Sequence, residues 1–535
     1  MTGVSRRAFL AGLLASGAAA CTRSGSEPGG ASPSTSTTVA GPSTSAVPAD
    51  LPSGLFTLGV ASGDPLSDSV ILWTRLAPDP FPGGGMPPVP IPVVWEVADD
   101  DGFRRRVAAG TATAAAEFGH SVHVDASGLE PAHEYFYRFR VGDEESPVGR
   151  TRTSPASDAE PARLRFAFAS CQNFQDGFYV AHRHLAAEEP ELVLFLGDYI
   201  YEGGALDGRS RRHATPAPGD LAGYRNRYAE YKSDADLQAS HAAAPWVCTW
   251  DDHEVVNNYA GAVTDGGTPL GLAPDEFAAL RAAAYQAYYE HLPLRVAPPS
   301  REGASFPIHR SLGWGRLARF YVLDTRQYRD DQPCGLPGDA GVVCPDVDAS
   351  GRTMLGAEQE AWLAGELGSA RAVWDVVAQQ VVVTQIAVSR LGQKAANLDQ
   401  WDGYPEARQR LVDRLGGLDN PVIVTGDIHA AGAAEVHADP RRPLDTPVAA
   451  TELVTTSIST LTNESYANLV ESAAAASPGV RYADARQRGY VVCEVTPERM
   501  RAEYRALSSA LTPDGGVSTA ASWIVRAGER GLEPA

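Results

Sequence analysis

The sequence of 535 residues lacks any apolar run of the roughly 18 residues that a membrane-spanning helix needs. It is also poor in positive charge, because 45 Lys and Arg stand against 66 Asp and Glu, for a formal net charge of -21. We therefore expect no membrane span and no nucleic-acid binding site, since nucleic-acid binding depends on basic residues that neutralise phosphates. An anionic substrate would need strong local positive charge, which bound metal ions supply compactly.

The N-terminus has the pattern of an export signal rather than of a folded element. Arg6 and Arg7 precede the apolar stretch 8–20, as in twin-arginine signals, although an ordinary basic N-terminus is the alternative interpretation. Cys21 follows three alanines, so lipid attachment at Cys21 and plain cleavage nearby are both open. We expect a protein exported by the twin-arginine route and then secreted, periplasmic or held at the cell surface, with or without a lipid anchor.

Cysteine is scarce, with six residues in the chain. Cys334 and Cys344 flank a loop-like Gly-Leu-Pro-Gly stretch, and we expect them to form a disulfide, which export permits. Cys248 and Cys493 lie in apolar strand-like runs, where a buried free thiol is the ordinary interpretation. Cys171 is the cysteine to which we assign a function.

The patterning changes twice along the chain. Residues 22–50 have almost no large apolar side chain and cannot bury enough surface to fold. Residues 51–157 contain short strand-like runs, and a Leu-Glu-Pro turn before Tyr135 and Tyr137 resembles the tyrosine corner of immunoglobulin-like or fibronectin-like sandwiches. After residue 162, continuous apolar strands alternate with helical stretches, as in an α/β domain.

These changes in the sequence pattern predict five segments of the chain and a set of secondary-structure elements. The parts are an export signal at 1–21, a flexible linker at 22–50, an N-terminal β-sandwich domain at 51–157, an α/β domain at 162–510 and a C-terminal segment at 511–535. Strands are expected at 70–73, 92–95, 121–124, 135–139, 164–168, 192–196, 246–250, 320–323 and 421–425. Helices are expected at 274–290 and 355–367.

Four of the predicted strands stop at residues of the types that bind metals. In α/β sheets, sites gather beyond the carboxyl ends of the strands, so the four strand ends predict one pocket. Each motif alone has a plainer interpretation: a Gly-Asp is often a turn, and the acidic run at 251–254 could be a solvated loop. The residues are Cys171, Asp198, Tyr201, Asp252, His253, Asp427 and His429.

The side-chain types indicate which metals would bind. A Cys thiolate or Tyr phenolate beside carboxylate and His suits iron rather than zinc or manganese. Carboxylates alone favour hard ions such as Ca²⁺ or Mg²⁺. The set predicted for a ferric ion is Cys171, Asp198, Tyr201 and His429. The set predicted for a second ion is Asp198, Asp252 and Asp427, with Asp198 bridging the two ions.

Such a pair of ions predicts hydrolysis of a phosphate ester. Two ions polarise a phosphoryl oxygen and lower the pKa of a bound water or hydroxide nucleophile. His253 would face the leaving group as a hydrogen-bond donor or general acid, so His253 and Asp252 are the predicted catalytic residues. Arg326 is a candidate phosphate ligand because guanidinium donors match phosphate oxygens; a structural ion pair is the alternative for Arg326 and Arg329.

The four motifs, in this order, resemble those of the PhoD-type alkaline phosphatases, within the calcineurin-like metallophosphoesterases. They are Ser-Cys-Gln at 170–172, Gly-Asp-Tyr-Ile-Tyr-Glu at 197–202, Asp-Asp-His-Glu-Val-Val-Asn-Asn at 251–258 and Gly-Asp-Ile-His at 426–429. Further matches are Gly-Val-Ala-Ser-Gly-Asp-Pro at 59–65, Leu-Trp-Thr-Arg at 72–75, Leu-Asp-Thr-Arg-Gln-Tyr-Arg at 323–329 and Leu-Gly-Ala-Glu-Gln-Glu-Ala-Trp-Leu at 355–363. Cys171 and Asp252 stand where most of the superfamily has Asp-x-His and Asn, which matches the PhoD branch.

The resemblance implies a fold and an activity. The fold is α/β (α+β), with a four-layer double-sheet sandwich flanked by helices that follows the N-terminal immunoglobulin-like or fibronectin-like β-sandwich. The activity is metal-dependent alkaline phosphatase action on phosphomonoesters, with one Fe³⁺ and one or two Ca²⁺ as cofactors. The implied iron ligands are Cys171, Asp198, Tyr201 and His429, and the implied calcium ligands are Asp198, Asp252 and Asp427.

Two alternatives and several contacts stay open. The first alternative is a phosphodiesterase acting on phospholipid or wall-polymer phosphodiesters, and the second is a non-catalytic surface-binding lipoprotein. His253, Arg326 and Asn258 are candidate substrate contacts, while Asn257 and Asn258 could instead support the calcium ligands. The expected partner is a phosphate-ester substrate, and we expect a monomer.

Overall fold

The fold is described from a computed structural model. The described residues are 48, 50–264, 272–299, 305–335, 341–369, 372–386, 388–390 and 393–535. The predicted export signal with Cys21 lies outside them, as does the linker up to residue 47. Residues 45–535 form one compact unit. Over the part of the chain that is described, no helix is long and apolar enough to cross a membrane.

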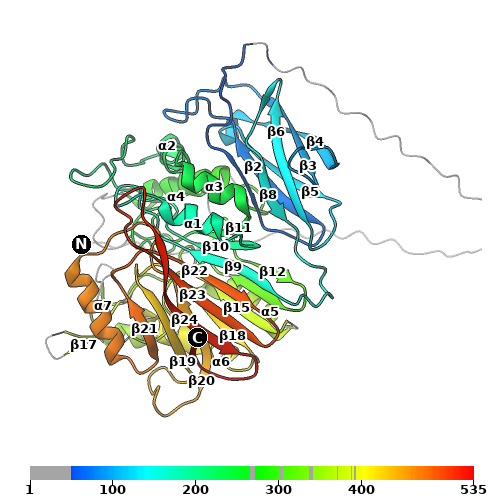
Figure 1. The fold of residues 1–535 in the computed structure, drawn as a ribbon. Helices are drawn as coiled ribbons and strands as arrows, with labels where there is room; N and C mark the ends of the chain where they lie inside the picture. Colours follow the sequence, from blue (N-terminus) through cyan, green and yellow to red (C-terminus); the bar gives the residue numbers. More distant parts are fainter. Residues whose placement is uncertain are drawn as a thin grey trace, which may run out of the picture. The chain divides into compact units, whose positions relative to one another are not determined.

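The larger of two facing sheets has ten strands (Figure 1). At its centre, three strands run parallel because helices connect them. Their residues are apolar on both faces, as expected for strands covered on both sides. Its strands, in spatial order, are β25 (Glu533–Pro534), β24 (Val517–Arg526), β23 (Arg499–Leu507), β22 (Gly489–Val495), β9 (Leu164–Ala169), β10 (Leu192–Leu196), β11 (Pro245–Thr249), β1 (Val60–Gly63), β2 (Ser69–Arg75) and β5 (Ser121–Ser127).

The second sheet has seven strands and packs face to face with the first. Phe166 and Leu194 from the first sheet share a buried cluster with Phe320, Val376 and Val422 from the second. The core between the sheets is therefore made by alternate side chains of both. The strands, in spatial order, are β12 (Arg310–Trp314), β13 (Ala318–Val322), β15 (Trp374–Ala378), β18 (Pro421–Thr425), β20 (Val448–Val454), β19 (Ala431–His437) and β21 (Val480–Asp484).

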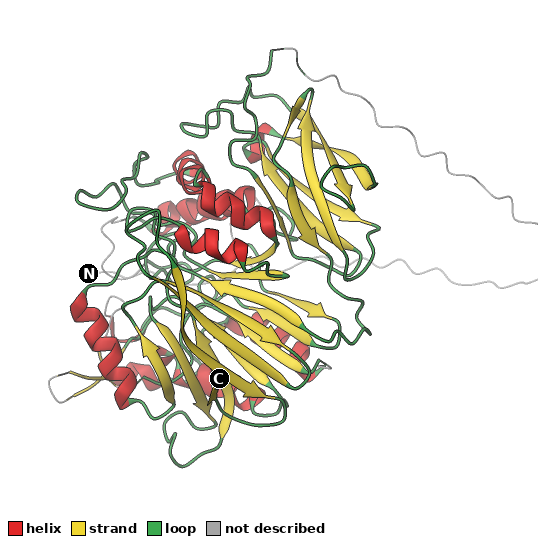
Figure 2. Ribbon diagram, in the orientation of Figure 1, coloured by secondary structure: helices red, strands yellow, loops and turns green. Residues whose placement is uncertain are grey.

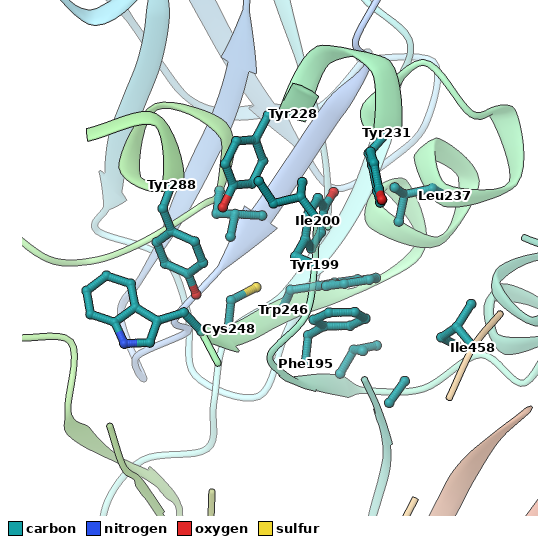
Figure 3. Close-up of a cluster of buried hydrophobic side chains, with 14 of the residues drawn as sticks. Phe195, Tyr199, Ile200, Tyr228, Tyr231, Leu237, Trp246, Cys248, Tyr288 and Ile458 are labelled. Carbon is teal, nitrogen blue, oxygen red and sulfur yellow. The ribbon is translucent and has the colours of Figure 1, made fainter. Parts of the chain in front are cut away.

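Helices cover the outer faces of both sheets, which completes the expected four layers (Figure 2). Four helices pack on the ten-stranded sheet: α1 (Val180–Ala187), α2 (Leu221–Lys232), α3 (Ala235–Ala243) and α4 (Pro274–His291). Two pack on the other sheet: α5 (Gly356–Gly368) and α6 (Pro405–Leu415). A further helix, α7 (Glu464–Ala476), lies beside β21. Figure 3 shows Phe195, Trp246 and Cys248 of β10 and β11 beneath Tyr228 and Tyr288.

The N-terminal sandwich is present, but one of its sheets is continuous with the ten-stranded sheet. Its second sheet consists of β3 (Ile91–Ala98), β4 (Arg106–Ala114), β6 (Glu134–Val141), β7 (Glu144–Glu145) and β8 (Gly149–Arg152). This sheet packs on β2 and β5 through one buried cluster. The expected corner is formed, since the Glu130 N–H donates to the Tyr135 hydroxyl at 2.8 Å. The sandwich is thus built onto the ten-stranded sheet and shares β1, β2 and β5 with it.

The two parts are joined where β1 pairs with β11. Gly63 is opposite Trp246 in the parallel register. A Cβ at Gly63 would lie 2.4 Å from the Pro293 carbonyl oxygen and 2.5 Å from that of Trp246, so only glycine fits this junction. A small sheet of β14 (Gly341–Val342), β16 (Val388–Arg390) and β17 (Gln393–Ala396) lies apart, next to the Cys334–Cys344 disulfide that was expected from the sequence.

Candidate metal centre

The predicted strand ends do converge, because backbone contacts tie them together. The N–H of Cys171 donates to the Gly197 carbonyl at 3.1 Å, and the N–H of Gln172 to that of Asp198 at 3.1 Å. Gly197 has a φ of 107°, and a Cβ there would be 2.4 Å from the Asp251 side chain. Glycine at 197 therefore lets the ends of β10 and β11 approach closely.

Glu254 links the same two strand ends through hydrogen bonds to its buried side chain. Its buried carboxylate accepts N–H bonds from Asp198 at 3.1 Å, Tyr199 at 2.5 Å and Asp251 at 2.9 Å. Burial raises the pKa of Glu254 to about 7, while these N–H donors act against the rise. Sequence reasoning gave Glu254 no role, although it stands in the quoted acidic motif.

Several predicted ligands adopt a backbone conformation that non-glycine residues rarely use. The φ angles are 60° at Cys171, 57° at Asp198, 63° at Asp427 and 54° at His429. Residues held in this left-handed region cost about 1–3 kcal/mol each and cluster at functional sites. The fold therefore holds these side chains in position at the expense of local stability.

The first group of side chains matches the predicted iron set. Ligand atoms of Cys171, Asp198 and His429 lie within 4.8 Å of one another. The Tyr201 hydroxyl donates to Oδ2 of Asp198 at 2.8 Å and lies 3.2 Å from Nε2 of His429. Thr460, which sequence reasoning missed, donates to the same hydroxyl at 2.9 Å. All four predicted side chains thus face one point.

Two further groups of ligand-type side chains are linked to the first, one through Asp198 and the other through Asp252. Ligand atoms of Asp198, Asp252 and His253 lie within 4.8 Å, as do those of Asp251, Asp252 and Asp427. Asp198 therefore belongs both to the Cys171 group and to the group with Asp252 and His253, which is the position expected of a bridging ligand, and Asp252 in turn links that group to Asp251 and Asp427. Asp251 is an additional acidic member that the sequence-based ligand set left out.

The electrostatics of the cluster are unfavourable without added positive charge. Burial, together with neighbouring carboxylates, raises the pKa of Asp198 well above its usual value. Burial likewise raises the pKa of Asp427 to about 7, against the attraction of Arg326. At Asp252, burial opposes ionisation, but attraction to Arg326 and His253 lowers the pKa. Buried oxygens of Asp198, Asp251 and Asp252 lack hydrogen-bond partners among the described residues.

His253 lies at the rim of this cluster and is held by Glu202. Its Nδ1 is 2.7 Å from Oε2 of Glu202, and its ring lies tilted against that of Tyr201 with centroids 4.1 Å apart. The other Glu202 oxygen accepts the Asn257 N–H at 2.9 Å. Burial disfavours the imidazolium, but attraction to Glu202, Asp198 and Asp252 raises the pKa of His253 well above its usual value. The surrounding carboxylates therefore favour the protonated form of the ring.

Comparison with known proteins agrees with this geometry. Residues 166–504 match the PhoD-like phosphatase family, and residues 42–155 match the PhoD-like phosphatase N-terminal domain. The chain belongs to the PhoD-like phosphatase family. It is 45% identical to alkaline phosphatase D of Bacillus subtilis (strain 168) over 487 residues, which cover 89% of this chain and 82% of that protein. A solved structure titled "Structure of PhoD" superposes with a TM-score of 0.84 at 44% identity, covering 90% of this chain and 92% of the other.

In this PhoD-like phosphatase, Arg326 already has partners. Its side chain is fully buried; Nη1 donates to Oδ1 of Asp399 at 2.9 Å, and Nε donates to Asp251. Arg329 is also buried and pairs with Asp399 at 2.7 Å. The ion-pair interpretation therefore describes the contacts of both arginines, and a phosphate contact from Arg326, whose Nη2 also lies 3.5 Å from Oδ1 of Asp252, stays a prediction. Asp399 lies some 70 residues away in sequence and carries no motif that could have identified it.

Asn257 and Asn258 act through their backbone. The Asn258 N–H donates to Oδ2 of Asp252 at 2.6 Å and orients that carboxylate. The Asn257 side chain is exposed, while its N–H bonds to Glu202. Gln400 has a comparable role that the sequence did not reveal, since its amide donates to Oδ2 of Asp427 at 2.6 Å.

Proposed function

We propose that this PhoD-like phosphatase is exported and hydrolyses phosphomonoesters at a centre that holds one Fe³⁺ and one or two Ca²⁺. The proposal rests on the position of Asp198, which is shared by two groups of ligand-type side chains. Its carboxylate lies within 4.8 Å of the ligand atoms of Cys171 and His429 in one group, and of those of Asp252 and His253 in another. Hydrolases with two adjacent ions need such a shared ligand to hold the ions a few ångströms apart.

The chain's residues fit two cations of different character. Buried carboxylate oxygens of Asp198, Asp251 and Asp252 have no donor among the described residues, and such atoms are costly unless a cation or water satisfies them. The thiol, phenol and imidazole of the first group are soft and borderline donors suited to iron. The second group offers carboxylate oxygens, which suit Ca²⁺.

Cys171, Asp198, Tyr201 and His429 would hold the iron, and Asp198, Asp252 and Asp427 would hold calcium. Bound in this way, the ions would lower the pKa of a water molecule and polarise a phosphoryl oxygen. Burial raises the pKa of the Cys171 thiol and the Tyr201 phenol, so both would release a proton when a cation binds.

His253 supplies the remaining chemistry from the chain itself. Glu202 holds Nδ1, so Nε2 is the atom left to face a substrate oxygen. The raised pKa keeps a proton on the ring, and a donor beside the leaving alcohol can contribute about 10²- to 10⁴-fold in rate. Asp252 lies within 4.8 Å of both His253 and Asp198, so it aligns the acid with the reacting centre.

An Asp198→Ala substitution tests the proposal. The purified variant should lose iron, calcium and phosphatase activity together, because the shared ligand is removed. Asp101→Asn, an exposed acid in the N-terminal sandwich, is the matched control and should keep all three. Full activity of Asp198→Ala, or a wild-type protein that binds no metal and cleaves neither monoesters nor diesters, would refute it.

The route of export and the fate of Cys21 belong to the same proposal. Replacing Arg6 and Arg7 with lysine should retain the enzyme inside the cell if the twin-arginine signal is used. Mass analysis of the mature N-terminus distinguishes a lipid on Cys21 from plain cleavage. Gel filtration of the mature enzyme tests the expected monomer.

A further inference from the structure

The segment that follows β20 lies against the backbone of Cys171. Ser457 pairs with Ser170 in an isolated parallel bridge. The N–H groups of Ser459 and Thr460 each donate to the Cys171 carbonyl oxygen at 3.4 Å. These bonds place Thr460 beside the first group of ligand-type side chains.

A buried arginine holds the same segment in place. Arg488 is 4% exposed, and its Nη1 donates to the Thr460 carbonyl at 2.6 Å and to the Ser457 hydroxyl at 2.8 Å. The Ser457 hydroxyl in turn donates to the Thr460 carbonyl at 2.6 Å. A guanidinium is rigid and planar, so its two bonds fix the direction of this carbonyl. The position of the Thr460 backbone therefore does not depend on the Thr460 hydroxyl alone.

The Thr460 hydroxyl has one proton and two acceptor oxygens within reach. It accepts the Asn173 N–H at 3.1 Å. It can donate to the Cys171 carbonyl at 2.8 Å or to the Tyr201 oxygen at 2.9 Å, but to one of them at a time. The carbonyl already receives the two N–H bonds from Ser459 and Thr460, which match its two lone pairs. The Tyr201 oxygen is therefore the acceptor that lacks a donor of its own.

The hydrogen bonds of the Tyr201 oxygen must change when this residue binds a cation. As a phenol it donates to Oδ2 of Asp198 at 2.8 Å. A phenolate has no proton and can only accept, and an ionised carboxylate has none to give it. A hydrogen bond to an anionic oxygen is roughly twice as strong as a bond between neutral groups. Thr460 is in position to supply this bond.

We propose that Thr460 is a positioning residue that donates a hydrogen bond to the Tyr201 phenolate and limits how much charge this oxygen gives to the proposed iron. The inference rests on the proposed function, because Tyr201 must be an iron ligand. Hydrogen bonds to ligand atoms tune a bound metal. With a donor on its oxygen, Tyr201 neutralises less of the ferric charge, and more of that charge acts on a phosphoryl oxygen.

Thr460→Val tests the inference, because valine has nearly the same shape and no hydroxyl. In the iron-loaded variant, the visible band expected of ferric tyrosinate should move to longer wavelength, since the electrons of an unbonded phenolate lie at higher energy. The reduction potential of the iron should fall, because the phenolate then gives it more charge. We expect kcat to fall about 10-fold. Thr460→Ser keeps the hydroxyl and should restore the band, the potential and kcat.

Thr455→Val is the matched control. Thr455 is fully buried in the same segment, and its hydroxyl donates to the neighbouring Thr456 carbonyl at 3.1 Å. This variant also loses one buried hydroxyl, but it should keep the band position and the potential of wild type. Equal shifts in Thr455→Val and Thr460→Val would show that the whole segment had moved, and would overturn the inference.

The alternative is that the Thr460 hydroxyl only supports the Cys171 carbonyl. Thr460→Val would then bind less iron, but the iron that it binds would show the wild-type band and potential. That result would overturn this inference and leave the proposed function in place. A wild-type protein that binds no iron would overturn both.

A measurement on wild type keeps the test decisive if Thr460→Val does not fold. In D₂O, a deuteron replaces the proton in the bond between Thr460 and Tyr201. The resonance Raman frequency of the phenolate C–O vibration should therefore shift between H₂O and D₂O. An unchanged frequency would overturn the inference.

Discussion

The burial of Lys232, at the end of α2, lowers the free energy of unfolding by an amount that depends on pH. The side chain is 1% exposed, with Nζ 4.0 Å from the ring centroid of Trp73 and 3.5 Å from the Tyr199 hydroxyl. Burial lowers the pKa of Lys232 from 10.5 to about 7, against a weaker attraction to Cys248. No described carboxylate forms an ion pair with it. The substitution that tests this is Lys232→Met, which keeps the length of the side chain and removes the amine.

The sign and size of this pH dependence follow from the difference in bound protons between the unfolded and folded chains. Between pH 7 and 10.5 the unfolded chain binds a proton that the folded chain does not, so this group makes stability rise with pH across that window. At 1.36 kcal/mol per pKa unit, burying the amine costs about 4 kcal/mol at pH 7 and about 1 kcal/mol at pH 10. Attraction to the Trp73 ring favours the charged form by about 1–2 kcal/mol. We therefore expect the penalty to fall by about 2 kcal/mol between these pH values.

Urea unfolding of the metal-loaded enzyme at pH 7 and pH 10 measures the difference. Lys232→Met should be more stable than wild type by about 3 kcal/mol at pH 7, and the gap should narrow to about 1 kcal/mol at pH 10. Lys394→Met removes an exposed lysine on β17 and should change the free energy of unfolding little at either pH. A gap between Lys232→Met and wild type that is equal at both pH values would refute the reasoning.

Three other substitutions test the metal centre. Glu254→Gln leaves only one acceptor oxygen for three N–H donors. Metal affinity, measured by titration, should therefore fall about 10- to 100-fold. Unchanged affinity would show that Glu254 does not align the ligands. Glu202→Gln should lower kcat for alkyl phosphates about 10²-fold. The loss should be much smaller for p-nitrophenyl phosphate, because its leaving group needs no proton. Equal losses for both substrates would argue against acid catalysis by His253. Tyr201→Phe should abolish the visible absorption expected of ferric tyrosinate, and a band that persists would mean that Tyr201 is not a ligand.

The elements themselves were largely predictable. The expected strand at 192–196 is β10, and the expected helices at 274–290 and 355–367 are α4 and α5 within one residue at each end. These segments carry strong local signals: continuous apolar runs for buried strands, and Pro274 at a helix start. The convergence of the motifs after β9, β10 and β11 could be predicted as well, because these parallel strands present their carboxyl ends at one edge, whereas the motif after β18 comes from the facing sheet and is brought to them only by the packing of the two sheets.

The relation between the domains was less predictable. The pattern at 51–157 indicated a sandwich, and the sandwich is there, but its β1 pairs with β11 across about 180 residues of sequence. Nothing local distinguishes a strand that closes a separate sandwich from one that extends a neighbouring sheet. The pairing of β1 with β11 is decided by the close approach of the backbone at Gly63. This approach depends on Pro293 and Trp246, which come from elsewhere in the chain.

The sequence by itself determined the kinds of atoms at the centre: a thiol, a phenol, an imidazole and several carboxylates, each at the end of a strand. The tertiary structure decided what each polar group faces. It pairs Arg326 with Asp399 and Asp251, gives Glu254 three N–H donors, and places the Gln400 amide against Asp427. The reason is physical: a residue's chemical type is local, whereas its partners, burial and pKa depend on chain segments that only folding brings together.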